Sequence, residues 1–236
     1  MAARDEARRI GATLAALARA FPNASTWVAD DGSRDATAQI AREAGARVVR
    51  CERRRGKGAA MTLAVREALR EVEADSPGTG AGRAEPHASA ATCGANLVLC
   101  DGDLGDSAVE LAVLADAVAR GQTDLAVAAF ARREGGGFGL ARAFARWAIR
   151  RRCGLDTSAP LSGQRALRAG VLADVLPFAR GFGMEIGMTI DAVRAGHRVV
   201  EIELDLDHRV TGRTPAGFVH RARQFGDCAR AYLTRG

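Results

Sequence analysis

The chain has 236 residues, of which 47% are hydrophobic and 26% charged, a composition that excludes a disordered chain and suits one sizeable α/β domain. A net charge of +6 suits a phosphate-bearing ligand or an anionic surface. Aromatic residues make up only 5%, which argues against a binder of single-stranded nucleic acid, because such proteins need stacking platforms.

Helices and strands alternate along the first 130 residues. Apolar residues at helical spacing predict helices, and short apolar runs predict strands. The expected helices cover about 6–20, 36–44, 57–74 and 107–119. The expected strands cover 26–29, 47–50, 96–100 and 125–130. This alternation predicts right-handed βαβ units and a mostly parallel sheet with helices on both faces.

The remaining stretches are less regular. Residues 75–95 are small, polar and rich in glycine, proline and alanine, which predicts a flexible insertion. After residue 130 we expect two helices, a strand and a final helix, at about 138–152, 184–195, 198–206 and 215–233. The first of these helices is basic and amphipathic. It either packs on its own domain, the favoured interpretation, or lies on anionic lipid.

Three polar motifs lie at or just after the ends of predicted strands, where ligands bind in open α/β sheets. They are Asp-Asp-Gly-Ser at 30–33, Arg-Gly-Lys-Gly at 55–58 and Asp-Gly-Asp at 101–103. In the third motif a glycine lets the chain turn sharply, so that Asp101 and Asp103 can reach one region. Carboxylates are the hard oxygen ligands that Mg²⁺ or Mn²⁺ prefers, so a metal site is favoured over a helix cap.

The other two motifs offer groups for a nucleotide. Asp30, at a strand tip, is free to accept from a nucleobase N–H, while Asp31 or Ser33 caps the next helix. Lys57 is the only lysine and stands between two glycines at a helix start, which favours an anion over a solvated loop. His208 ends a strand, and its imidazole could join carboxylates on a manganese-like ion.

Cysteine usage and hydropathy bear on the compartment. The five cysteines form no CxxC pattern, which is typical of reduced thiols. No apolar run approaches the roughly 20 residues that a membrane span needs, and the first residues are charged. We therefore expect a cytoplasmic protein and leave open peripheral contact with the membrane from that side.

In this order, the three motifs resemble the donor half of family 2 glycosyltransferases, which have the GT-A fold. Residues 3–6 resemble the end of the element that opens that family. Three later segments, at 160–164, 181–187 and 208–209, are similar to glucosyl-3-phosphoglycerate synthases and their relatives. The resemblance covers nearly the whole chain and is specific for the superfamily rather than for the substrate.

The resemblance implies a role for each matching residue. The implied donor-binding residues, which would hold a UDP-sugar, are Glu6, Asp30, Lys57, Asp101, Leu161 and Gly163. The implied metal ligands are Asp103 and His208, and the implied catalytic residues are Glu185 and Asp103. Beyond the matched motif, Thr211 and Arg213 could bind an acceptor phosphate, because arginine presents forked donors that suit phosphate.

Two departures from the family pattern qualify these expectations. The opening strand should precede Ala3, so we expect a GT-A sheet that lacks its usual first strand, through a misplaced start or a true loss. Inverting family members carry Glu-Asp where this chain has Glu185 followed by Ile186. Glu185 therefore serves as the base, or the enzyme retains the anomeric configuration.

We expect one GT-A domain over residues 1–236, with a nucleotide-sugar half at 1–130 and an acceptor half at 131–236. Its predicted function is metal-dependent sugar transfer from a nucleotide sugar to a phosphorylated small molecule or a polyprenyl phosphate. Nucleotidyl transfer is an alternative, although no glycine-rich loop follows the first strand. An inactive transferase-like protein and a homodimer both remain open, whereas a nucleic-acid partner is not expected.

Overall fold

The computed structural model describes residues 1–74, 96–130, 139–206 and 215–235, and no side chains within 215–224. The predicted insertion at 75–95 and the predicted site residues His208, Thr211 and Arg213 lie outside the described residues. The strands are β1 (Ala2–Ala3), β2 (Trp27–Asp30), β3 (Arg47–Arg50), β4 (Asn96–Leu99), β5 (Leu125–Phe130), β6 (Arg165–Arg168) and β7 (Val199–Leu204). The longer helices are α1 (Ile10–Ala20), α2 (Thr37–Glu43), α3 (Lys57–Ala74), α4 (Leu111–Ala119), α5 (Gly139–Cys153), α7 (Gly183–Arg194) and α8 (Pro215–Thr234).

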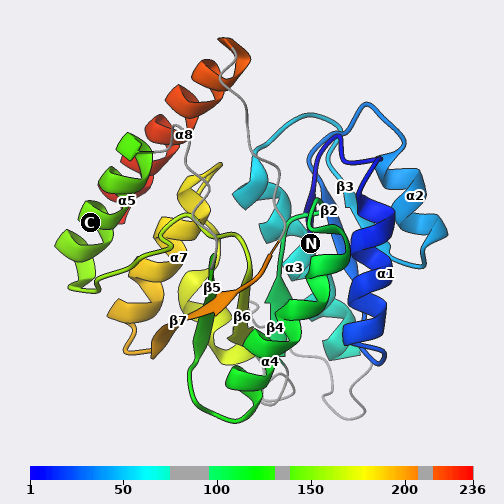
Figure 1. Ribbon diagram of the computed structural model, residues 1–236, viewed down its shortest axis with the longest axis horizontal. Helices are drawn as coiled ribbons and strands as arrows, with labels where there is room; N and C mark the ends of the chain where they lie inside the picture. The colour runs from blue at the N-terminus through cyan, green and yellow to red at the C-terminus, as the bar shows by residue number, and fades with distance from the viewer. Residues whose placement is uncertain (75–95, 131–138, 207–214, 236) are drawn as a thin grey trace.

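The strands form two sheets that meet near the start of the chain (Figure 1). The first sheet has the order β1-β2-β3 and is parallel throughout. The second has the order β4-β6-β5-β7, in which β5 and β7 are parallel while β6 runs antiparallel to both of its neighbours. A parallel bridge between Ala2 and Asp101 joins the two sheets. The predicted fold class, a mostly parallel sheet with helices around it, is confirmed.

A short opening strand is present, so the expectation that it is missing was wrong. β1 lies between β2 and the residues that follow β4. Its Ala2 donates its N–H to the carbonyl of Cys100 at 2.8 Å and accepts from the N–H of Gly102 at 2.8 Å. On its other side, Ala3 accepts from the N–H of Asp31 at 3.1 Å. The strand thus fixes the first and third motifs side by side.

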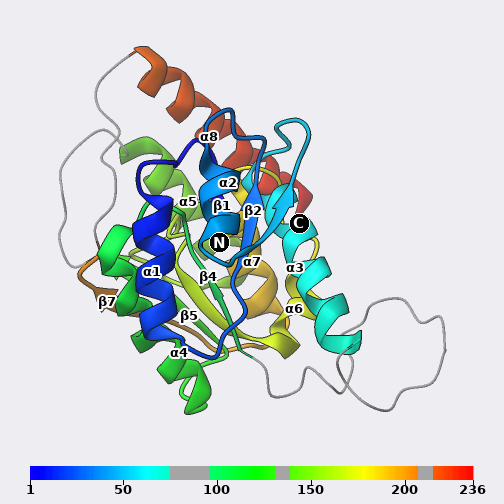
Figure 2. The ribbon, with the colours of Figure 1, turned by 90° about the vertical axis from the view of Figure 1, so that its right-hand side faces the viewer.

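Helices cover both faces of the sheets in a three-layer arrangement (Figure 2). On one face α1 and α4 supply a core cluster that includes Ile10, Leu14, Leu111 and Leu114. On the other face α3 and α7 pack a second cluster. Because apolar side chains of alternate strand residues enter both clusters, the sheet is buried from both sides, as α/β folds require.

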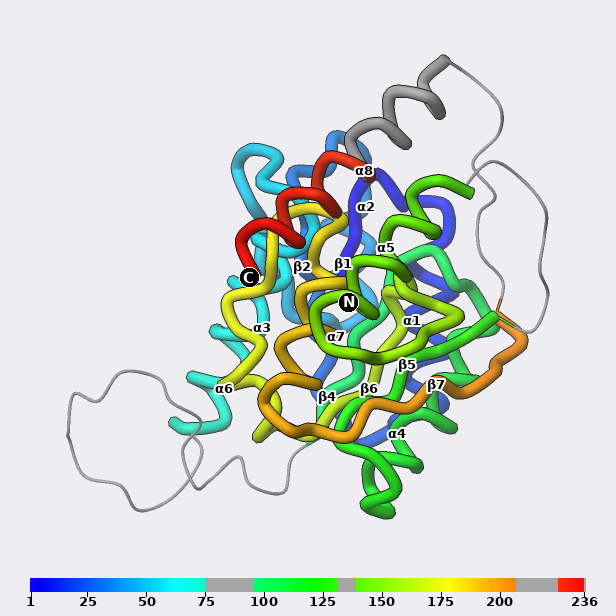
Figure 3. Tube along the Cα trace, turned by 90° about the vertical axis from the view of Figure 1, so that its left-hand side faces the viewer, coloured from blue at the N-terminus to red at the C-terminus, as the bar shows by residue number. Residues whose placement is uncertain are grey.

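The later helices form an outer layer of the second half. α5 and α8 pack on α7, which Figure 3 shows from their side. Ala145 and Ile149 of α5 meet Ile186 and Ile190 of α7 in a third apolar cluster. The basic helix therefore packs on its own chain, as the favoured interpretation expected. Among the described residues, none of the helices combines the length and hydrophobicity that crossing a bilayer requires.

Asp124, just before β5, gives a test of how charge stabilises the second sheet. Its carboxylate accepts from the N–H of Arg198 at 2.9 Å and pairs with Arg168. The hydrogen bond from Arg198 and the nearby arginine charges lower the pKa of Asp124 below its ordinary value of 3.8. A lowered pKa means that the stabilisation is complete at neutral pH and is lost as the pH falls through the lowered value.

We therefore expect Asp124→Asn to reduce the free energy of unfolding by about 2 kcal/mol at pH 7, the loss typical of a charged hydrogen bond. The difference from the parent chain should shrink below about pH 4. Urea denaturation at pH 7 and at pH 3 measures both values. Asp116→Asn, at an exposed helix position, is the control and should change little. A difference that stays constant across this pH range would contradict the assignment.

Candidate active site

The Asp-Gly-Asp motif forms a turn that α1 holds in place. The hydroxyl of Thr13 donates to the carbonyl of Gly102 at 3.0 Å and accepts from the N–H of Gly105 at 2.8 Å. The helical turn that follows has Leu104 as its N-cap residue and no capping side chain. The helix-cap alternative for Asp103 is therefore not observed, and both carboxylates of the motif remain available to the site.

Lys57 lies between two carboxylates from distant parts of the chain. Its Nζ is 2.6 Å from Oδ1 of Asp101 and 2.8 Å from Oε1 of Glu185. Its side chain is 19% exposed, which excludes the solvated-loop alternative. Burial opposes the charge of the ammonium, but the carboxylates of Asp101 and Glu185 outweigh burial and raise the pKa of Lys57. The lysine is therefore charged and fixed in position.

The two glycines beside Lys57 let backbone pack directly on backbone. Gly56 has a φ of +90° and contacts Gly181 just before α7. A Cβ at Gly58 would overlap the carbonyl oxygen of Ala179. The loop is shaped further by Asp31, whose carboxylate accepts from the N–H of Gly56 at 3.0 Å. The expectation that Asp31 or Ser33 caps α2 was therefore wrong, since α2 has no side-chain cap.

A segment before β6 closes the site from the second half. The side-chain amide of Gln164 donates to Oδ2 of Asp101 at 3.0 Å. A Cβ at Gly163 would overlap Nζ of Lys57 and lie 2.6 Å from the same Asp101 oxygen. Leu161 is partly buried against the apolar cluster of α5, α7 and α8, and its expected place at the sugar stays a prediction. Sequence reasoning singled out Gly163 but missed Gln164, whose only signal was its place in the Pro-Leu-Ser-Gly-Gln motif.

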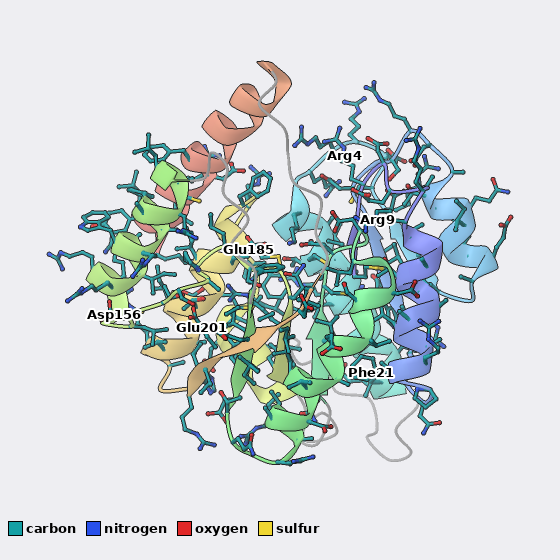
Figure 4. The ribbon with its side chains drawn as sticks, in the orientation of Figure 1. Arg4, Arg9, Phe21, Asp156, Glu185 and Glu201 are labelled. Atoms are coloured by element: carbon teal, nitrogen blue, oxygen red, sulfur yellow. The ribbon has the colours of Figure 1, made fainter. Side chains whose placement is uncertain are left out.

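Glu185 lies in the first turn of α7, near the middle of the molecule (Figure 4). Only 2% of the residue is exposed. Its Oε1 pairs with Lys57, and its Oε2 is buried without a hydrogen-bond partner among the described residues. A buried carboxylate oxygen without a partner is costly, so it marks a position where a ligand can contribute a donor. The predicted catalytic residue is thus brought together with Lys57 and Asp101.

The remaining predicted donor residues lie around the first motif. Asp30 is fully buried, and its Oδ1 accepts from the N–H of Ser33 at 2.9 Å and from the Ser33 hydroxyl. Its Oδ2 lies 3.3 Å from Nε of Arg50. Glu6 precedes α1, and its N–H donates to the hydroxyl of Thr37 at 2.8 Å. The ligand contacts expected of Asp30 and Glu6 stay predictions.

Asp101 and Asp103 present the donor chemistry that a divalent cation needs. Burial and the neighbouring charge of Asp101 raise the pKa of Asp103, because two carboxylates on one turn repel each other. A cation between or beside them would relieve that repulsion, so the residues fit Mg²⁺ or Mn²⁺. Within the described ranges, no cluster of three or more His, Cys, Asp or Glu residues is placed to hold a metal. The predicted third ligand, His208, is outside those ranges.

The close approach at Gly163 yields a direct test of the site. We expect Gly163→Ala to lower kcat/KM for a nucleotide sugar about 10- to 100-fold, because the added methyl displaces Lys57 or Asp101. Gly170→Ala is the matched control, since nothing lies within 4 Å of a Cβ there. Steady-state kinetics of both variants measure the two values of kcat/KM. Equal kcat/KM for the two would show that the Lys57 and Asp101 positions do not matter for turnover.

Comparison with known proteins agrees with this geometry. The family model described as Glycosyl transferase family 2 matches residues 1–72. A search of curated protein sequences found no match. Among solved structures, the chain is similar to glucosyl-3-phosphoglycerate synthase from Mycobacterium tuberculosis in its complex with phosphoglyceric acid. The TM-score is 0.71 at 26% identity, over 99% of this chain and 77% of that one.

Two further structures of that enzyme are similarly close. The complex with Mn²⁺ and uridine-diphosphate-glucose has a TM-score of 0.68 at 26% identity, over 98% of this chain and 76% of that one. The complex with Mn²⁺, uridine-diphosphate and glucosyl-3-phosphoglycerate has a TM-score of 0.68 at 25% identity, over 99% and 77%. The resemblance to family 2 glycosyltransferases is thus confirmed, and the protein is a glycosyltransferase.

Proposed function

We propose that this glycosyltransferase transfers a sugar from a UDP-sugar to a small phosphorylated acceptor, in a reaction that needs Mg²⁺ or Mn²⁺. The observation that carries the proposal is the convergence of Lys57, Asp101, Gly163 and Glu185 at one edge of the sheets. Similar structures bind uridine-diphosphate-glucose with Mn²⁺, and phosphoglyceric acid, which supports this donor and this class of acceptor.

The residues take the following parts in the proposal. Asp103 and Asp101 would hold the ion together with His208, and such an ion would supply positive charge to the leaving diphosphate. Lys57 adds a second positive charge at the donor phosphates. Residues 1–130 bind the donor, with Asp30 and Glu6 on the uridine. Residues 131–236 bind the acceptor through Thr211 and Arg213, while Leu161 and Gly163 shape the sugar pocket.

In the transfer, an acceptor hydroxyl oxygen bonds to the anomeric carbon while the bond from that carbon to the phosphate oxygen breaks. The nucleoside diphosphate leaves with the bonding electrons, and the hydroxyl proton must depart. Two roles are open to Glu185: it accepts that proton in an inverting transfer, or it stabilises charge at the sugar in a retaining transfer, in which the leaving diphosphate oxygen takes the proton. The anomeric configuration of the product, measured by proton NMR, distinguishes them.

A coupled screen tests the proposed function. Purified protein is incubated with UDP- and GDP-sugars and with 3-phosphoglycerate or glycerol 3-phosphate, with Mn²⁺ or with EDTA. We expect nucleotide release and a glycosylated product only with UDP-sugars, phosphorylated acceptors and Mn²⁺. In parallel, a UDP-sugar with Mn²⁺ should raise the melting temperature, because it binds the folded state. Ligand binding without turnover would favour the inactive transferase-like alternative.

One observation supports a lipid-linked phosphate as a second candidate acceptor. Leu140 and Trp147 of α5 are 84% and 50% exposed, and they stand among exposed arginines such as Arg146 and Arg150. An apolar and basic surface of this kind suits an anionic membrane interface. If the acceptor is a polyprenyl phosphate, the protein should float with vesicles that contain phosphatidylglycerol at low salt. Sedimentation of all the protein away from such vesicles would exclude this version.

A further inference from the structure

The carboxylate of Glu201, on β7, binds a segment that lies between α5 and β6. Its Oε2 accepts from the N–H and the hydroxyl of Ser158, at 2.8 Å and 2.7 Å. Its Oε1 accepts from the N–H of Ala159 at 3.0 Å and from the hydroxyl of Thr157. Both oxygens of one carboxylate are thus saturated by three consecutive residues.

These hydrogen bonds are strong because the acceptor is charged. Burial opposes the charge on Glu201, but the donors of Thr157, Ser158 and Ala159 outweigh burial and lower the pKa of this carboxyl. A backbone stretch without helix or strand has few other partners for its N–H groups. The attachment to Glu201 therefore fixes where the segment from Thr157 to Gln164 runs.

The far end of the same segment reaches the active site. The carbonyl of Ser162 accepts from Nε of Arg165 at 2.9 Å, and its hydroxyl donates to Oε1 of Gln164 at 3.2 Å. The amide of Gln164 then donates to Asp101, as described above. Gly163, between them, lies against Lys57. The segment therefore supplies one wall of the site and a hydrogen bond to its carboxylate.

Arg165 ties this segment to the helix that carries Glu185. Only 1% of Arg165 is exposed, and its Nη1 donates to the hydroxyl of Thr189 on α7 at 3.0 Å. The Thr189 hydroxyl in turn donates to the carbonyl of Glu185 at 2.9 Å. Burial lowers the pKa of Arg165 to about 10, against the opposing charges of Glu185 and Glu201. The hydrogen bonds of the arginine thus hold Ser162 relative to α7.

We propose that Glu201 is a positioning residue, which holds the segment from Thr157 to Gln164 so that Gly163 and Gln164 stay against Lys57 and Asp101. The inference rests on the proposed sugar transfer for its effect on turnover. Its structural part, the hold of Glu201 on the segment, is independent of that function. Glu201 itself does not contact the groups that react; it acts through the residues it anchors.

The test uses Glu201→Gln in the full chain, with Glu203→Gln as the matched control. Glu203 is exposed on the same strand, two residues further on, so the control removes the same charge without touching the segment. A glutamine presents an amide donor where Ser158 needs an acceptor. We expect amide hydrogen exchange within 158–164 to quicken at least about tenfold in Glu201→Gln, and to be unchanged in Glu203→Gln.

Kinetics supply the second readout. Well below the melting temperature, Glu201→Gln should lower kcat about 10- to 100-fold and raise KM for the nucleotide sugar, while Glu203→Gln retains both constants. Unchanged exchange, or quickened exchange with unchanged kinetic constants, would overturn the inference. If Glu201→Gln does not fold, Ser158→Ala removes a single donor and should give smaller changes in the same directions. If the parent chain turns over no nucleotide sugar, the proposed function fails, and hydrogen exchange alone then decides whether Glu201 holds the segment.

Discussion

Lys57→Met is expected to reduce kcat/KM for the nucleotide sugar about 100- to 1,000-fold. The lysine is held between Asp101 and Glu185 and is therefore preorganised, so it need not be recruited as negative charge develops on the leaving diphosphate. Removing one preorganised electrostatic group from an active site typically costs about this much. Steady-state kinetics with saturating Mn²⁺ measure the loss.

The same variant should also be less stable, because it leaves Asp101 and Glu185 without the cation that separates them. Breaking a buried ion pair from one side costs about 3 kcal/mol, which urea denaturation can detect. Lys57→Arg is the control for charge. It should recover most of the stability but only part of the turnover, since a planar guanidinium does not fit the place of an ammonium beside Gly163. Turnover at the parent level in Lys57→Met would contradict the assignment of the lysine to the donor phosphates.

Asp103→Asn is expected to reduce metal-dependent turnover about 1,000-fold, which corresponds to losing about 4 kcal/mol of transition-state stabilisation. Stability should not fall with it. Because burial and Asp101 raise the pKa of Asp103, its charge is unfavourable in the folded state at neutral pH. The melting temperature without metal should therefore equal or exceed that of the parent chain, and Mn²⁺ should no longer raise it.

Asp106→Asn is the matched control for that experiment. Asp106 lies only three residues after Asp103, but it is an exposed acid that pairs with Arg19 at the surface. It should keep both the turnover and the response of the melting temperature to Mn²⁺. If Asp103→Asn retained either property, the assignment of Asp103 to the metal would be wrong, whereas loss of both in Asp106→Asn would point to a general charge effect.

The sequence predicted most of the first half because each element there follows a local rule. The helix from Ile10 and the strand from Trp27 show clear apolar patterns and appear close to their expected bounds. β1 could not be predicted in the same way. It has two alanines, which have little strand preference, and it exists through hydrogen bonds to Cys100, Gly102 and Asp31.

β6 was missed for a related reason. Its sequence, Arg-Ala-Leu-Arg, has charged residues at both ends, and such a pattern does not predict a buried strand. Arg165 is nevertheless buried, because the carbonyl of nearby Ser162 and the hydroxyl of Thr189 on α7 accept its hydrogen bonds. The same limit applies to the site. Lys57, Asp101 and Glu185 were each singled out, but only the fold reveals that they are partners, and nothing local marks Glu201 as an anchor.

The two glycines around Lys57 have a consequence for how far this chain can vary. Where Gly58 meets Ala179 and Gly56 meets Gly181, the backbones of the two halves touch with no side chain between them. Any residue with a Cβ at position 58 would push the halves apart and carry the lysine with it. A library randomised over these positions and selected for function should thus return glycine at 58 almost without exception. Changes that adapt the chain to a new acceptor are therefore expected in the surrounding loops, because this junction does not accept a side chain.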